Sequence, residues 1–111
     1  MTSGEAGPNP DAPSPILSTG ATILSRNVVI TNKRGLHARA AAKFVTLAEQ
    51  FGACVDVIRE EQAVSARSIM GLMMLGAGRG STIQLRAEGW DAKEALDALA
   101  ALVEAGFHEQ D

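Results

Sequence analysis

The chain has 111 residues, of which 46% are hydrophobic, and a formal net charge of −3 at pH 7. This length predicts one domain with a single core. The acidic balance and the content of only 4% aromatic residues lack the basic stripe and stacking rings of a nucleic-acid surface. A nucleic-acid partner is therefore not expected.

The chain has one cysteine, Cys54, which excludes an intramolecular disulfide and a cysteine metal cluster and favours a reducing compartment. We interpret Cys54 as a small buried hydrophobe on a strand rather than a reactive thiol. No lysine or arginine precedes Arg26, and the first apolar cluster, Ile16 and Leu17, is short. Neither a secretory signal nor a membrane span is predicted, so we expect a cytoplasmic protein without a membrane partner, metal or cofactor.

Residues 1–22 contain all four prolines, among glycine, serine and alanine. This composition buries little apolar surface and predicts a disordered N-terminal tail, with a docking arm as the alternative. Residues 23–108 then form the single domain.

Residues 24–32 contain a β-branched cluster that predicts a strand, ended by the turn-like residues 32–35. A helix is predicted to begin just after His37 and to stop at Gly52. Apolar residues recur along it at a period near 3.6 residues, which indicates one buried face. The residues of this face are Ala41, Phe44, Val45, Ala48 and Phe51.

Residues 54–59 and 63–66 are two short strand candidates separated by a polar stretch, which predicts a hairpin. The compact apolar run of residues 69–75 predicts a short helix. Ser68 is placed to cap its start and Gly76 to close its end.

Residues 81–88 alternate between apolar and polar side chains, the period of a strand with one buried face. Asp91, with Glu94 three residues later, predicts a capping box that starts a last helix, and Gly106 ends it. The apolar stripe of this helix consists of Ala95, Leu96, Leu99, Leu102 and Val103. His108 follows the helix and is predicted to be exposed.

The order of these elements is βαββαβα. A central hairpin and three helices that each bury one stripe predict an α/β (α+β) domain with a four-stranded antiparallel sheet, covered on one face by the three helices. Such a domain is an open-faced β-sandwich. The pattern by itself also fits a ferredoxin-like fold with an added helix.

His37 stands just before the N-terminus of the first predicted helix, a position that suits a nucleophile that carries an anionic group. Imidazole nitrogen is a competent nucleophile near neutral pH. The first backbone N–H groups of the helix, those of Ala38, Arg39 and Ala40, have no acceptor within the helix and point toward the same space. Arg39 adds a charged fork that suits phosphoryl oxygens. These residues point to a phosphoryl group carried on His37.

Residues 35–45 (GLHARAAAKFV) and 67–73 (RSIMGLM) resemble the two motifs of the HPr family, the phosphocarriers of the bacterial phosphoenolpyruvate-dependent phosphotransferase system. The resemblance covers roughly residues 24–107 and implies the same open-faced sandwich. It implies that His37 accepts a phosphoryl group at Nδ1 from phosphorylated Enzyme I and passes it to an EIIA-type domain, with Arg39 as the arginine of the motif.

The chain departs from the family pattern at two positions. Ala40 stands where most members have proline, which leaves an extra N–H donor and a looser turn at the helix start. Arg67 stands in place of the usual lysine. Alanine-containing motifs resemble those of the nitrogen-related or alphaproteobacterial branch, which suggests regulation more than sugar uptake.

Ser68 falls on the serine that an HPr kinase/phosphorylase modifies in the family, so the resemblance implies a regulatory phosphosite. A phosphate there adds about −2 charge at a helix start. The short helix that follows has more apolar residues than one face can bury, and methionine-rich surfaces adapt to several partners. The predicted docking residues are Ile69, Met70, Leu72 and Met73.

The leading interpretation is a monomeric phosphocarrier that works between partner enzymes and is not itself an enzyme. The alternative is a regulatory protein-binding module of the same fold, switched at Ser68, in which His37 does not relay phosphate.

Overall fold

The computed structural model describes residues 23–109. The predicted tail, residues 1–22, lies outside the described residues. Within the described part, no helix has the length and apolar character needed to cross a membrane. The elements in chain order are β2 (Ile23–Val29), α1 (Ala38–Ala48), β3 (Cys54–Arg59), β4 (Gln62–Ser65), α2 (Ile69–Met74), β5 (Thr82–Glu88), α3 (Ala92–Glu104) and the short 3₁₀ helix η1 (Gly106–His108).

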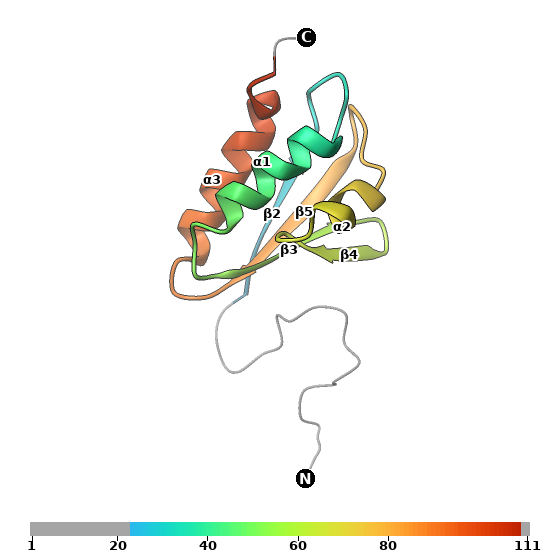
Figure 1. Ribbon diagram of the computed structural model, residues 1–111. Coiled ribbons are helices and arrows are strands. Elements are labelled where there is room, and N and C mark those ends of the chain that lie inside the picture. Colours follow the sequence, from blue (N-terminus) through green and yellow to red (C-terminus); the bar gives the residue numbers. More distant parts are fainter. Residues whose placement is uncertain (1–22, 110–111) are drawn as a thin grey trace.

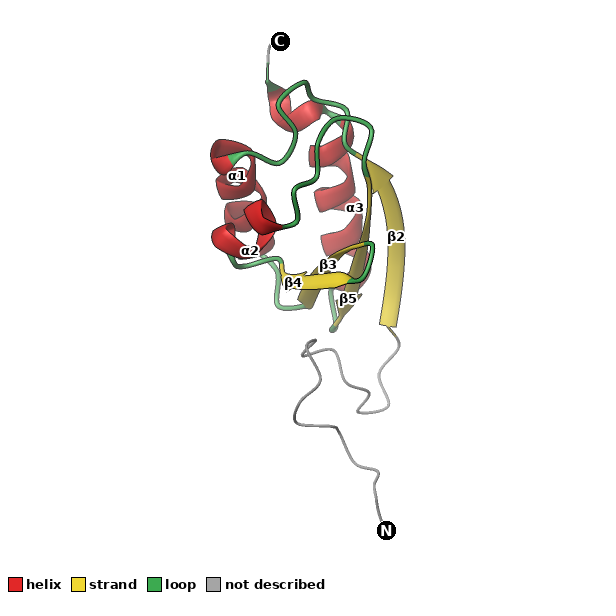
Figure 2. Cartoon of the chain, turned by 90° about the vertical axis from the view of Figure 1, so that its right-hand side faces the viewer, coloured by secondary structure: helices red, strands yellow, loops and turns green. Residues whose placement is uncertain are grey.

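The four strands form one sheet in the order β2-β5-β3-β4, and every neighbouring pair is antiparallel. The helices all lie on one side of this sheet and leave its other face open (Figures 1 and 2). The predicted open-faced sandwich and the order βαββαβα are therefore confirmed.

The core lies between the sheet and the helices. On the central strand β5, Ile83, Leu85 and Ala87 are at most 1% exposed, which confirms the alternation read from the sequence. Helices α1 and α3 turn their apolar stripes toward this face. Their buried members are Ala40, Ala41, Phe44, Val45 and Ala48 on α1, and Ala92, Ala95, Leu96, Leu99, Ala100, Leu102 and Val103 on α3.

Two predicted boundaries shift. The first strand ends at Val29 rather than near residue 32, because its pairing with β5 ends at the Val29–Thr82 pair. Helix α1 ends at Ala48 with Glu49 as its C-cap, so Gly52 does not stop it. After Ala48 the hydrogen bonds change to the tighter spacing of a turn, since the N–H groups of Gln50 and Phe51 donate to the carbonyls of Leu47 and Ala48.

Asp91 holds that loop, and the predicted capping box is wrong. The Asp91 carboxylate makes no hydrogen bond to its own helix. It accepts the backbone N–H groups of Gly52 at 2.9 Å and Ala53 at 2.8 Å, and the residue is only 5% exposed. Burial between the two loops directs this carboxylate across to the α1–β3 loop, so Asp91 ties the entry to α3 to the entry to β3.

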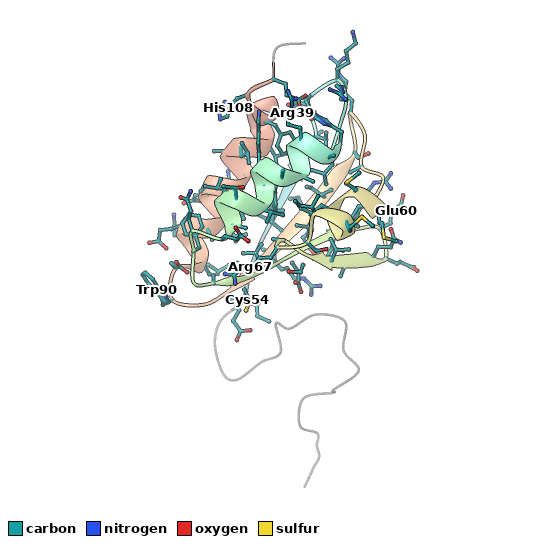
Figure 3. The ribbon with its side chains drawn as sticks, in the orientation of Figure 1. Arg39, Cys54, Glu60, Arg67, Trp90 and His108 are labelled. Carbon is teal, nitrogen blue, oxygen red and sulfur yellow. The ribbon has the colours of Figure 1, made fainter. Side chains whose placement is uncertain are left out.

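Cys54 is exposed, which corrects the expectation of a buried thiol. It is the first residue of β3, and the next residue, Val55, is buried in the core. Because side chains alternate along a strand, Cys54 lies on the open side of the sheet. Figure 3 places it near Arg67, at the end of the molecule away from Arg39.

We expect Asp91→Ala to lower the free energy of unfolding by about 3 kcal/mol, because two buried N–H groups lose a charged acceptor. Chemical denaturation followed by circular dichroism measures the change. Asp97→Ala is the matched control, since Asp97 is exposed and its partners among the described residues are the surface residues Arg26 and Lys93. An equal fall in the free energy of unfolding in both variants would show that the Asp91 hydrogen bonds do not stabilise the contact between the two loops.

Candidate phosphoryl-acceptor site

Gly35 fixes where the first helix begins. Its φ is +68°, and a Cβ there would lie 2.6 Å from the carbonyl oxygen of Ala77 and 2.7 Å from the Cα of Gly78. The next N–H, that of Leu36, donates to the same Ala77 oxygen at 2.9 Å. Only glycine tolerates both this φ and this approach. The chain that leads into α1 is therefore pressed against the glycine-rich turn of residues 76–80.

His37 is the N-cap residue of α1, as predicted. Its backbone is extended, with φ −78° and ψ 179°, and its side chain makes no capping hydrogen bond. Its carbonyl accepts the N–H of Ala41 at 2.8 Å, which begins the helix. The positive end of the helix dipole and the first N–H groups of α1 therefore lie next to an imidazole that has no capping role.

The three residues predicted to hold phosphoryl oxygens follow directly. Ala38 and Arg39 are exposed, whereas the side chain of Ala40 is wholly buried and anchors the first turn. The residues four positions before them lie outside α1, so their N–H groups have no carbonyl acceptor within the helix. This end of the helix can hold an anion.

Arg39 lies on an open groove of about 480 Å³ between α1 and α3. Lys43 and His108 line the same groove, and Figure 3 shows Arg39 and His108 at the same end of the molecule. In the part of the chain that the structure describes, no hydrogen bond joins the Arg39 guanidinium to the His37 ring. Within residues 23–109, the Arg39 guanidinium has no hydrogen-bond or ion-pair partner that would keep it from an incoming anion.

Glu109, which the sequence did not single out, contacts the His37 ring. Its Oε2 is hydrogen-bonded to His37 Nε2, and its Oε1 accepts from Asn32 Nδ2 at 3.0 Å. Burial would raise the pKa of the Glu109 carboxyl. The hydrogen bonds from Asn32 and His37 and the charges of His37 and Arg34 outweigh burial, so this pKa lies below its ordinary value of 4.5. Glu109 is a carboxylate at neutral pH.

Asn32 connects this carboxylate to the loop before the helix. Its Nδ2 also donates to the carbonyl of Gly35 at 2.8 Å, and the residue is 3% exposed. The sequence of residues 32–35 predicts a turn. It gives no sign that Asn32 binds Glu109, which lies 77 positions later.

Ser68 is the N-cap of α2, as predicted, and its Oγ accepts the N–H of Gly71 at 2.9 Å. The side chain is partly buried. As a phosphosite, Ser68 stays a prediction.

Helix α2 exposes a methionine patch, which we define as Ile69, Met70, Met73 and Met74. Met70 and Met74 are 70% and 71% exposed, and Ile69 and Met73 are each 41% exposed. Leu72 is 0% exposed, so its prediction as a docking residue is wrong. A helix of six residues must bury part of its surface to stay on the domain, and Leu72 supplies that contact. Met74 takes its place on the exposed side.

Comparison with known proteins identifies relatives that match most of the chain. The family model "PTS HPr component phosphorylation site" matches residues 24–105. Phosphocarrier protein NPr of Shewanella violacea is 51% identical over 88 residues, which cover 79% of this chain and 97% of that protein. Phosphocarrier protein HPr of Cupriavidus necator is 51% identical over 87 residues, which cover 78% and 98%.

A solved structure gives the same result. The crystal structure of HPr-C-His from Thermoanaerobacter tengcongensis has a TM-score of 0.75 and 43% sequence identity, and the match covers 79% of this chain and 99% of that one. HPr proteins carry phosphoryl groups between partner proteins of the phosphotransferase system and are not themselves enzymes. The sequence and the fold together show that the chain belongs to the HPr family of phosphocarrier proteins.

Proposed function

We propose that His37 accepts a phosphoryl group from phosphorylated Enzyme I and passes it to an EIIA-type protein. One observation carries this proposal. The His37 imidazole stands at the N-terminus of an 11-residue helix and makes no capping bond there, so the helix N–H groups and its dipole are left for an anion on the ring.

The backbone N–H groups of Ala38, Arg39 and Ala40 hold the oxygens of the phosphoryl group in this proposal. Arg39 supplies the permanent charge that phosphoryl transfer requires on those oxygens. Its exposure on an open groove with Lys43 and His108 supports this role, because the guanidinium need not leave another partner. Ala40 keeps an N–H that proline would lack.

Partner docking is assigned to the methionine patch. Enzyme I, the EIIA-type acceptor and an HPr kinase/phosphorylase would each contact it, and flexible thioether side chains adapt to surfaces of different shape. Helix α2 packs beside α1 (Figure 2), so a partner on the patch lies close to the start of α1. The carrier acts as a cytoplasmic monomer, without a nucleic-acid or membrane partner.

Regulation is assigned to Ser68. A phosphate on its Oγ would add about −2 charge at the start of α2, where the helix dipole tolerates it. That charge would stand at the edge of the methionine patch and oppose the docking of acidic partners. The similarity to a protein named NPr and the alanine at position 40 support a nitrogen-related regulatory pathway rather than sugar uptake.

We expect phosphoenolpyruvate and Enzyme I to place one acid-labile phosphate on the chain, and His37→Ala to abolish it without loss of the fold. Mass spectrometry and phosphorus NMR detect the phosphohistidine. His108→Ala is the matched control, because it removes the chain's other histidine and should leave labelling intact. If several cognate Enzyme I proteins left the native chain unlabelled, a binding module switched at Ser68 would replace this proposal.

We expect Ser68→Asp to raise the KM for phosphorylation by Enzyme I several-fold, because a negative charge at the patch weakens docking. Ser68→Asn is the control. Asparagine and aspartate both cap helix N-termini well, so the two variants keep the cap and differ mainly in charge. Steady-state kinetics with increasing carrier concentration give the KM values. An equal rise in both variants would assign the effect to the cap, not to the charge.

A further inference from the structure

The last described residues follow an uncommon backbone path. Gly106, Phe107 and His108 have successive φ values of +64°, +57° and +59°. Non-glycine residues seldom adopt this left-handed conformation, and it persists where surrounding contacts determine it. Such backbone outliers cluster at functional sites. We therefore asked what this turn positions.

Two contacts hold the turn in place. The Phe107 side chain is 0% exposed and belongs to the core. The Phe107 carbonyl accepts from Lys43 Nζ on α1 at 2.7 Å. The turn directs the next residue, Glu109, back over the start of α1, where its side chain is 12% exposed beside a His37 side chain that is 15% exposed.

The Glu109 carboxylate restricts the His37 ring. A carboxylate oxygen only accepts hydrogen bonds, so the nitrogen that faces it, Nε2, carries the hydrogen. In the neutral ring the lone pair then lies on Nδ1. Asn32 holds the other carboxylate oxygen, so the glutamate is itself oriented from two sides.

We propose that Glu109 is a positioning residue that holds His37 in the tautomer with Nδ1 free to accept the phosphoryl group, and that balances the charge of the ring once it is phosphorylated. This inference rests on the proposed function of His37. An acidic side chain that fixes an imidazole tautomer and stabilises its cation is a recurring device in catalysis.

The transfer step needs no other group to move a proton. The Nδ1 lone pair forms the new bond to phosphorus, while the bond from phosphorus to the donor atom breaks and its electron pair stays with the donor. The hydrogen on Nε2 remains in place, so the ring becomes a cation beside the Glu109 carboxylate. Transfer to the acceptor reverses this step and returns the lone pair to Nδ1.

The test compares Glu109→Gln with the native chain, and Glu104→Gln is the matched control. Glu104 is a half-exposed glutamate at the end of α3, and its ion-pair partner is Arg26. Its replacement therefore removes the same charge and leaves the contact between Glu109 and His37 in place. Nitrogen-15 NMR of the histidine ring reports the tautomer without any phosphate. Rates of phosphorylation by Enzyme I are measured in parallel, and thermal melts verify that each variant is folded.

We expect the native chain and Glu104→Gln to hold the hydrogen on Nε2. Glu109→Gln should populate both tautomers, because an amide both donates and accepts. Its limiting rate of phosphorylation should fall about tenfold, because removing a group that orients a histidine causes a loss of about this size. The KM should change little. A restored rate in Glu109→Asp would further support a positioning carboxylate.

An unchanged tautomer in Glu109→Gln would overturn the inference and leave the proposed function of His37 standing. A faster rate in Glu109→Gln would also overturn it, because the carboxylate would then obstruct the incoming phosphoryl group. A native chain that takes no phosphate from Enzyme I would overturn the proposed function, and the role of Glu109 in transfer with it, whatever tautomer the ring shows.

Discussion

The site depends on one close backbone contact, the approach of Gly35 to Ala77 and Gly78. The turn of residues 76–80 leads into β5, which lies between two other strands of the sheet. The loop before α1 packs onto that turn, so the start of the helix is held against a segment that leads into an interior strand. His37 therefore gains a fixed position from the backbone, although its own side chain lies near the surface.

The end of the molecule that carries His37 is locally basic, although the net charge of the chain is negative. The chain is acidic overall, yet Arg34, Arg39 and Lys43 all belong to the loop before α1 or to the first two turns of the helix. A local basic region on an acidic protein attracts an anion without attracting nucleic acid in general. In the proposed carrier, the exposed methionine patch would add apolar contact area, so that charge attraction and apolar contact would come from separate residues.

Sequence patterns predicted the features that depend on near neighbours. The helix start after His37, the Ser68 cap and the alternation of β5 all follow from residues within a few positions of one another. The contacts of Asp91 and Glu109 do not, because their partners lie 38 or more positions away. Asp91 and Glu94 match the capping-box pattern, but the Asp91 carboxylate is buried against another loop and accepts the N–H groups of Gly52 and Ala53 instead. Leu72 was misassigned because the apolar run of α2 is too short for periodicity to separate its faces.

Trp90 has a consequence for how this protein is observed. It is the single tryptophan of a chain without tyrosine, it is 89% exposed, and its ring lies beside Gly52, where an added Cβ would be 2.8 Å from the indole Nε1. Figure 3 places it at the end of the molecule away from Arg39. Intrinsic fluorescence therefore reports the loops joined by Asp91, and an optical probe close to His37 has to be introduced separately.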